Sequence, residues 1–318
     1  MNKRVVNLRS QAPLLDIVSY ARGRGPLTPT QRAYVARTVR RVPEVMVKVS
    51  GGARTLAGVQ RHMKYIEKKG EFGLETDMNT RASGADFAPN LVRDWDLDVE
   101  ALNHYSKKSV RGKPPRLVHN IIFSMPAGTS PTKVLEAVRR LALNEWALEH
   151  RYAIALHTDT PRPHLHVVVK AVSEQGIRLN IKKVTLRSWR AQFAANLREL
   201  GVAANATERA VRGETRTHKR TAIYRAAQRN DSLHVRDAQA KALRDAVGEL
   251  QFRDPGFAVL NLTRNDVLAG WRALEAKMRA FGDDELAREI GVFADQLNPV
   301  QTEHASLVKH AHALARSR

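Results

Sequence analysis

Residues 155–170 read ALHTDTPRPHLHVVVK and hold three of the chain's twelve histidines, His157, His164 and His166. The segments on either side of TPRP have the apolar character of strands, and the tetrapeptide itself is typical of a turn. Because side chains alternate faces along a strand, His164 and His166 share one face of the second strand. If the two strands form a hairpin, all three imidazoles converge with His157 opposite the other two.

Three neutral imidazoles on a rigid sheet can form a facial metal site with open positions for a substrate. Ala153 and Ala155 precede His157 on its face of the strand and leave space beside the rings. Asp159 is placed to hold one ring nitrogen as a partner of the ligands. The alternative is that two histidines pack in the core and the third lies in a turn. The spacing favours metal binding, but a metal site is compatible with both hydrolysis and Lewis-acid activation of a phosphoryl oxygen.

Outside this hairpin the 318-residue chain is strongly basic, with 53 Lys and Arg against 32 Asp and Glu and a net charge of +21. Such an excess indicates a polyanionic partner: DNA, RNA or an anionic membrane. No apolar run approaches the roughly 18 residues needed to span a bilayer, so we expect no membrane insertion. No uninterrupted apolar segment follows the basic N-terminus, so we expect no secretory signal. The absence of cysteine excludes thiolate nucleophiles and cysteine zinc sites and suits a reducing cytosol.

The hydrophobic pattern around the hairpin predicts an α+β sheet domain, because strand-like and helix-like periods alternate along the chain. The predicted order is β-α-α-β-α-β-β-β-α, with strands over 44–50, 116–125, 151–159, 164–172 and 177–181, and helices beginning at 55, near 91, at 131 and at 185.

Charge and pattern divide the chain into three parts. Residues 1–43 form a basic N-terminal extension with nine Lys or Arg and one acidic residue, which is either a nucleic-acid-binding arm or a solvated extension. Residues 44–210 form the sheet domain. Residues 211–318 are helical in pattern, with breaks at 253–256 and 298–301, and we assign them an accessory or translocation role.

The helix beginning at residue 55 carries a tyrosine on its polar side. The apolar stripe from Leu56 to Ile66 defines the buried face, and Tyr65 points about 140° away from it at 3.6 residues per turn. The basic residues of the same helix are Arg61, Lys64, Lys68 and Lys69. A tyrosine among cations is well placed to meet a phosphate.

An ordinary tyrosine has a pKa of about 10 and is a weak nucleophile unless cations or a base favour its phenolate. Attack of Tyr65 on a phosphodiester would give a phosphotyrosyl link that keeps the bond energy and can be reversed. From the helix alone, an amphipathic surface tyrosine remains the alternative.

Three stretches together resemble motifs of the relaxase/mobilisation nuclease family, in the branch similar to the T-DNA border-nicking endonuclease. MKYIEKKG resembles the nucleophile motif and implies that role for Tyr65. HNIIFSMPAGT resembles a second motif, whose serine, here Ser124, helps to position DNA near the nick. Family members often carry a histidine directly before the apolar triplet of this motif, whereas here Asn120 stands there and His119 precedes it.

HTDTPRPHLH fits the third motif of the family, H-x-D-x4-H-x-H. It implies that His157, His164 and His166 are metal ligands beside Asp159. The resemblance covers about residues 44–225, and the order and spacing of the three motifs make it specific.

This resemblance implies a histidine-hydrophobe-histidine (HUH) endonuclease fold, a mainly antiparallel five-stranded sheet flanked by helices and here followed by a helical C-terminal region. It also implies nicking of one DNA strand at an origin of transfer, covalent attachment to the 5′ end and later rejoining. The expected cofactor is Mg²⁺ or Mn²⁺. The expected partners are origin-of-transfer DNA, an accessory DNA-binding relaxosome protein and a type IV coupling protein. The expected location is the bacterial cytoplasm, with export of the DNA-linked protein into a recipient cell.

Further cations follow the sheet domain and are candidates for phosphate contacts, although a solvated linker explains them almost as well. They are Arg212, Arg216, Lys219 and Arg220.

Three other functions compete with the relaxase interpretation. A rolling-circle replication initiator shares the tyrosine and the histidines, but such proteins usually present the H-x-H strand before the tyrosine helix, and Tyr65 precedes the histidines. A metal-dependent phosphodiesterase that uses water would not need the tyrosine. In a non-catalytic DNA-binding module the histidines would only pack.

Overall fold

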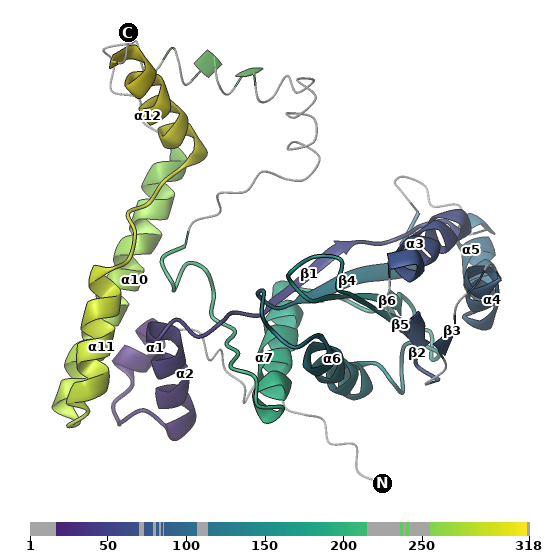
Figure 1. The fold of residues 1–318 in the computed structure, drawn as a ribbon, viewed down its shortest axis with the longest axis horizontal. Coiled ribbons are helices and arrows are strands. Elements are labelled where there is room, and N and C mark those ends of the chain that lie inside the picture. The colour runs from purple at the N-terminus through teal and green to yellow at the C-terminus, as the bar shows by residue number, and fades with distance from the viewer. Residues whose placement is uncertain are drawn as a thin grey trace. The chain divides into compact units, whose positions relative to one another are not determined.

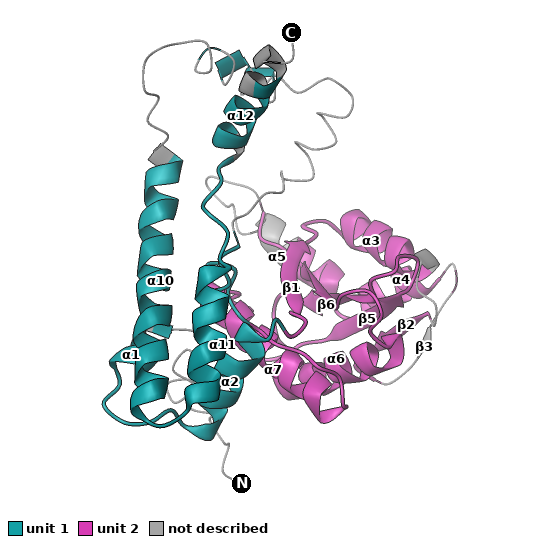
Figure 2. Cartoon of the chain, turned by 60° about the vertical axis from the view of Figure 1, so that its left-hand side comes forward, with its two compact units in different colours: residues 1–41, 207–318 teal, residues 42–206 magenta. Residues whose placement is uncertain are grey.

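The computed structural model of the chain describes residues 17–69, 73–78, 81–82, 84, 86–106, 114–214, 236–237, 240–241, 244 and 255–316. They fall into two compact units, one within residues 42–206 and the other within residues 1–41 and 207–318 (Figure 2). The two ends of the unit formed by residues 42–206 lie side by side. The backbone N–H of Val45 donates to the carbonyl of Asn205 at 2.9 Å, and Asn205 donates to that of Pro43 at 2.8 Å.

A six-stranded antiparallel sheet forms the centre of residues 42–206, in the order β1-β4-β6-β5-β2-β3 (Figure 1). The strands are β1 (Met46–Gly51), β2 (Leu74–Thr76), β3 (Arg81–Ala82), β4 (Val118–Ser124), β5 (Tyr152–His157) and β6 (His164–Lys170). The predicted α+β fold with an antiparallel sheet flanked by helices is confirmed. Beyond five longer strands, the sheet adds only the two-residue β3 at its edge.

One predicted strand is wrong, and another was missed. Residues 177–181 form only a single bridge, between Val172 and Arg178, because the chain turns at once into a helix that begins at Lys183. The fifth place in the sheet belongs instead to β2, which pairs with β5. With three residues, β2 is too short for its period to be recognised in the sequence.

Helices cover both faces of the sheet (Figure 1). On one face α6 (Pro131–Glu145) and α7 (Lys183–Glu199) pack over a core that includes Phe123, Trp146 and Trp189. On the other face lie α3 (Leu56–Lys69), α4 (Phe87–Asp94) and α5 (Leu97–Ser106). The single helix predicted near 91–105 is two helices, because Asp96 adopts a positive φ of 51° between them.

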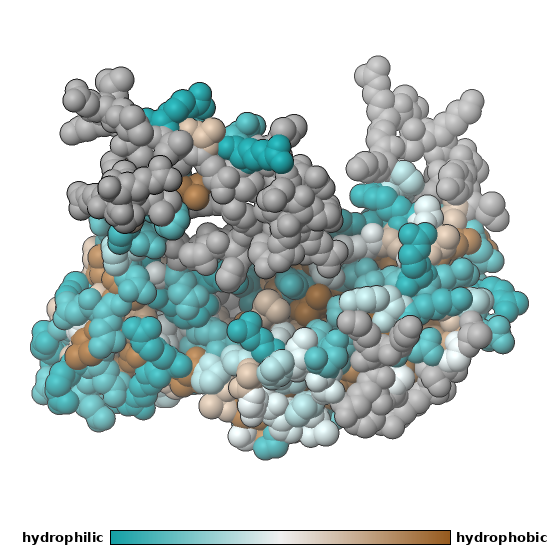
Figure 3. Space-filling view, turned by 45° about the horizontal axis from the view of Figure 1, so that its top comes forward, coloured by the Kyte–Doolittle hydropathy of each residue, from teal (hydrophilic) through white to brown (hydrophobic). Residues whose placement is uncertain are grey.

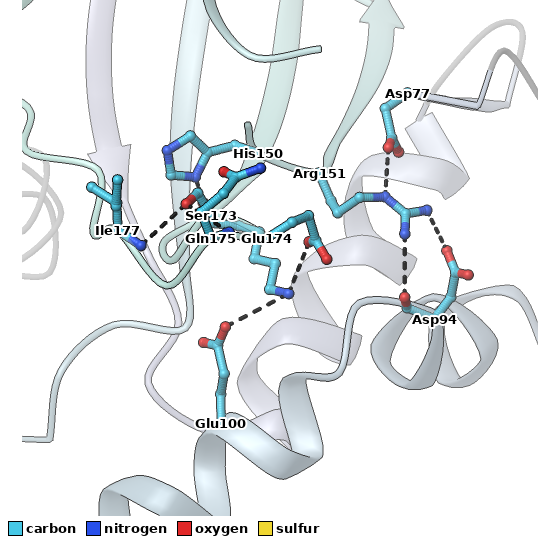
Figure 4. A network of polar contacts seen from close by, with 10 residues as sticks. Asp77, Asp94, Glu100, His150, Arg151, Ser173, Glu174, Gln175 and Ile177 are labelled. Atoms are coloured by element: carbon cyan, nitrogen blue, oxygen red, sulfur yellow. Dashed lines mark hydrogen bonds and ion pairs between the residues drawn. The ribbon is translucent and has the colours of Figure 1, made fainter. Parts of the chain in front are cut away.

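Ion pairs tie the α4–α5 side to the ends of β5 and β6 (Figure 4). Arg151 donates from Nε to Asp77 at 2.5 Å and from Nη2 to Asp94 at 2.6 Å. Lys170 is buried and pairs with Glu174 at 3.0 Å and Glu100 at 3.7 Å. Burial raises the pKa of Asp77, opposed by the charge of Arg151. The carboxylate therefore depends on this guanidinium to remain ionised.

The unit formed by residues 1–41 and 207–318 is helical in its described parts. Its described helices are α1 (Ile17–Arg22), α2 (Pro29–Val39), α10 (Pro255–Ala280), α11 (Asp284–Asp295) and α12 (Glu303–Arg316). Residues near both ends of the chain share its core, among them Ile17, Val35, Trp271 and Ile290. The predicted helical character of the C-terminal region is thus observed in its described parts, with a further break at Gly282, where φ is 79°.

The basic N-terminal extension contributes to this core. Arg32 pairs with Asp283 at 2.6 Å, and Arg40 pairs with Glu289 at 3.0 Å. The division into residues 1–43, 44–210 and 211–318 treated the two ends as separate segments, whereas the structure groups their described parts in one unit. Two arginines of the extension are therefore used to hold α2 against α11.

The described helices include none that is both long and apolar enough to cross a bilayer. On the face shown in Figure 3, most coloured side chains are hydrophilic and the hydrophobic ones form small separate patches. This surface agrees with the high content of charged residues.

Deleting residues 1–41 is expected to open the core of the helical unit, because it removes α1 and α2 from around Trp271 and Ile290. Limited proteolysis with mass spectrometry should then show faster cleavage within residues 255–295. Deleting only residues 1–16 retains both helices and is the control. Equal protection in the two deletions would contradict a structural role for the extension.

Arg151→Met is expected to lower the free energy of unfolding by about 3 kcal/mol, because it leaves Asp77 as a buried, unpaired carboxylate. Urea unfolding followed by tryptophan fluorescence measures the change. Arg140→Met is the matched control, since Arg140 pairs with Glu136 at an exposed site and should cost less than about 1 kcal/mol. Equal losses in the two variants would show that the Asp77 pairing is not stabilising.

Candidate active site

The hairpin of β5 and β6 brings three histidines together. Its register pairs His157 with His164 and Ala155 with His166, so all three rings lie on the face of the sheet that α3 covers. The ring centroids of His157 are 4.6 Å from those of His166 and 5.2 Å from those of His164. One nitrogen from each ring lies within 4.8 Å of the others. The convergence expected from strand alternation is therefore present.

Backbone carbonyls orient two of the rings. Nε2 of His157 donates to the carbonyl of Ile66 at 2.8 Å, and Nδ1 of His164 donates to that of Arg162 at 3.1 Å. A carbonyl oxygen only accepts, so these bonds place a proton on the bonded nitrogen, and in a neutral ring the other nitrogen then carries the lone pair. Nδ1 of His166 is buried and has no hydrogen-bond partner among the described residues.

The electrostatic setting keeps the His166 ring neutral. Burial, followed by the charges of His157 and His164, lowers the pKa of His166 to about 3. A neutral imidazole offers a lone pair to a cation, whereas a protonated one does not. Three convergent imidazoles, one of which has a ring nitrogen without a partner among the described residues, fit a divalent metal ion.

Helix α3 brings Tyr65 to this cluster. Val59, Met63 and Ile66 are fully buried, as the predicted stripe requires, whereas Tyr65 is 52% exposed. The Tyr65 ring centroid lies 6.5 Å from that of His166. The hydrogen bond from His157 to the carbonyl of Ile66 joins α3 to the histidine cluster, and Ile66 directly follows Tyr65 in the sequence.

The loop between β1 and α3 fixes where the helix begins. Leu117 donates its backbone N–H to the carbonyl of Ala53 at 2.8 Å, next to the start of β4. A Cβ at Gly52 would lie 2.3 Å from the carbonyl oxygen of Val118. Only glycine allows this close approach of the two backbones.

Ser124 ends β4 beside the histidines. In the sheet it is opposite His164, so it shares their face. Its side chain is buried, and Oγ donates to the carbonyl of Met125 at 3.4 Å. Ser124, whose hydroxyl the resemblance implies helps to position DNA, therefore lies in the same cross-strand row as His164 and His157.

His62 was not singled out in the sequence, yet its ring lies close to both Tyr65 and His166. Its ring stacks on that of Tyr65, with centroids 6.4 Å apart, and its centroid is 6.2 Å from that of His166. Burial lowers the pKa of His62, and the charge of His157 adds to this effect. The sequence did contain a signal for this contact, because His62 and Tyr65 are three residues apart on α3 and residues at that spacing are neighbours on a helix.

Residues 65–202 match the family described as relaxase, MobA/VirD2-like, nuclease domain. The chain carries a MobA/VirD2-like relaxase nuclease domain. The matched range begins at Tyr65 and includes Ser124 and the three clustered histidines.

Three relatives are T-DNA border endonucleases VirD2. That of Agrobacterium fabrum is 28% identical over 219 residues, which cover 61% of this chain and 46% of the relative. That of Rhizobium radiobacter is 28% identical over 201 residues, covering 54% and 43%. That of Rhizobium rhizogenes is 26% identical over 203 residues, covering 54% and 42%. The chain thus aligns with less than half the length of each relative.

The remaining predicted site residues of the relaxase domain lie on α3 and in the turn after β5. Asp159 lies in the exposed turn that follows β5. Arg61 and Lys64 are exposed on α3. Lys68 and Lys69 belong to α3, but their side chains lie outside the described part of the structure.

The predicted cations that follow the relaxase domain belong to the other unit. Arg212 is 19% exposed and pairs with Glu214 at 2.7 Å, so a phosphate would have to compete with this carboxylate. Arg216, Lys219 and Arg220 lie outside the described residues.

His119 and Asn120, the two residues of the second motif whose roles were open, lie on opposite faces of β4. His119 pairs with Val169, a residue of the α6–α7 core, and therefore faces away from the clustered histidines. Burial, then the charges of Arg116 and Arg178, lowers its pKa to about 4. Asn120 is on the same face as the cluster, and its Oδ1 is buried without a partner among the described residues.

His166→Ala is expected to weaken Mn²⁺ binding at least about tenfold, because it removes one of three convergent nitrogen donors. Calorimetric titration of the purified protein measures the change, and circular dichroism confirms the fold. His310→Ala, at an exposed histidine of α12, is the control and should bind as wild type does. Unchanged affinity in His166→Ala would remove the histidine cluster as the metal site.

Proposed function

We propose that this relaxase nicks one DNA strand at an origin of transfer, with Tyr65 as the nucleophile. The observation that carries the proposal is the distance of 6.5 Å between the ring centroids of Tyr65 and His166, because it brings the phenol to the histidine cluster. Tyr65 is also 52% exposed, so a DNA backbone can reach it without unfolding α3.

The reaction is a transesterification and needs no redox partner. The phenolic oxygen of Tyr65 forms a bond to the phosphorus of one phosphodiester as the bond from phosphorus to the 3′ oxygen breaks. The phenolic proton is lost, and the departing 3′ oxygen gains a proton. The product is a 5′-phosphotyrosyl strand and a free 3′ hydroxyl. Rejoining is the reverse of the same steps, because the bond energy is retained.

His157, His164 and His166 would hold a divalent cation, which acts when bound as a Lewis acid on a phosphoryl oxygen. Of the two ions expected, nitrogen donors suit Mn²⁺ better than Mg²⁺, which prefers oxygen ligands. We assign Ser124 to positioning of the strand, because its hydroxyl lies in the row of the histidines. Asp159 is assigned to orienting a ligand ring from the turn after β5.

The DNA would be single-stranded at the nick, and Arg61 and Lys64 on the exposed side of α3 are the described cations nearest in sequence to the nucleophile. We assign them, with Lys68 and Lys69, to phosphate contacts. An accessory relaxosome protein and a type IV coupling protein are the proposed protein partners. We place the reaction in the bacterial cytoplasm, before export of the DNA-linked protein.

Tyr65→Phe is expected to abolish a covalent protein–DNA adduct. Single-stranded oligonucleotides with a randomised centre and a 3′ label are incubated with protein and Mn²⁺ and run on a denaturing gel. Wild type should retain the 3′-labelled fragment on the protein, because the nucleophile bonds to its 5′ phosphate. Tyr152→Phe, at a buried tyrosine on the opposite face of the sheet, is the control. Cleavage that leaves a free 5′ phosphate and no adduct would favour a hydrolase that uses water.

A further inference from the structure

The edge strand β1 extends the sheet surface on which the histidines lie. Lys48 in β1 pairs with Ile122 in β4, and Ile122 pairs with His166 in β6. Residues paired in this way point to the same face of a sheet. Lys48 therefore shares a face and a row with His166. With strands about 4.8 Å apart, its Cα is about 10 Å from that of His166.

This part of the sheet is open to solvent on the histidine side. Along β1, Val45 and Val47 are buried in the α6–α7 core, whereas Met46, Lys48 and Ser50 are exposed. No carboxylate stands among the residues that β1 and β4 present to this face. Those residues are Met46, Lys48, Gly51, Val118, Asn120, Ile122 and Ser124.

Lys48 has no acidic partner to neutralise it within the described ranges. None of the salt bridges there includes its ammonium group. Its field nevertheless reaches the histidine cluster, because the charge of Lys48 is among the causes that lower the pKa of His166. A cation in the row of His166 with no salt bridge among the described residues attracts the phosphates of a polyanionic strand.

We infer that Lys48 is a phosphate-binding residue of the nicking site, whose ammonium contacts a backbone phosphate of the single strand at or next to the scissile one. This inference rests on the proposed function and assigns a contact from β1, which lies outside the matched residues 65–202. Lysine suits the role, because it binds phosphate as a compact point charge on a long, flexible stem. The strand would then cross the open surface of β1 and β4 on its way to Tyr65.

The salt dependence of binding tests this contact without cleavage. A fluorescent single-stranded 30-mer of mixed sequence is titrated at several salt concentrations with variants in a Tyr65→Phe background. Lys48→Met should reduce the slope of log K against log salt by about 0.7, the value for one phosphate contact on a single strand. Lys48→Arg retains the charge and should preserve the slope. Lys133→Met, at an exposed lysine of α6 on the opposite side of the sheet, is the matched control.

A scan with neutral methylphosphonates locates the contact. Each phosphate around the mapped nick is replaced in turn, and the affinities of Tyr65→Phe and of Tyr65→Phe with Lys48→Met are compared. At the contacted phosphate, the replacement should weaken binding by the Tyr65→Phe protein. It should not weaken binding by the protein that also carries Lys48→Met, because that protein has already lost the contact. At other phosphates both should respond equally.

The outcomes separate the two proposals. If wild type forms no adduct with any oligonucleotide, the proposed nicking fails, and the inference that rests on it fails too. If wild type forms the adduct but Lys48→Met keeps the parent slope, or loses no more than Lys133→Met, only the Lys48 contact is overturned. A reduced slope with coupling at one phosphate near the nick supports it.

Discussion

The register between β5 and β6 is the constraint on which the rest of the site depends. Leu165 and Val167 face the α6–α7 core, and His164 and His166 alternate with them on the other face. A slip of one residue would send the aliphatic side chains to the histidine side and the imidazoles into the core. Burial of the core and assembly of the metal-binding face are therefore the same event. The strand register that stabilises the sheet therefore also holds the nitrogen donors together.

The tyrosine reaches the histidines through a separate set of contacts. Helix α3 docks by its buried stripe, and Gly52 lets the preceding loop approach β4. The bond from His157 to the carbonyl of Ile66 closes the connection across 91 residues of sequence. No single segment could create this arrangement, because the hairpin supplies the donors, the loop sets the start of the helix and the helix presents the phenol.

The sequence predicted the elements with a clear period and missed those whose place is decided by distant partners. The histidine hairpin and the face of α3 followed from strand and helix periods, and both are confirmed as structure. Two-residue β3 and three-residue β2 are too short to show a period. Arg32 was read only as one basic residue of a possible arm, because Asp283 lies 251 residues away and no local pattern reveals that pairing. His62 and Lys48 become site residues only through the docking of α3 and the register of β1 with β4.

The histidines and Tyr65 differ in how deeply they are buried, and this difference suits the reversible transfer proposed above. His157 is 1% exposed and is oriented by a backbone carbonyl, so the donor set is built before any DNA arrives. Tyr65 is 52% exposed at the margin of the same face, where a strand can approach and, once linked, remain attached without disturbing the core. A tyrosine buried as deeply as the histidines would need the domain to open in order to accept or release a strand. If Tyr65 acts as proposed, its exposure on α3 avoids that cost, because a strand can reach it without opening the domain.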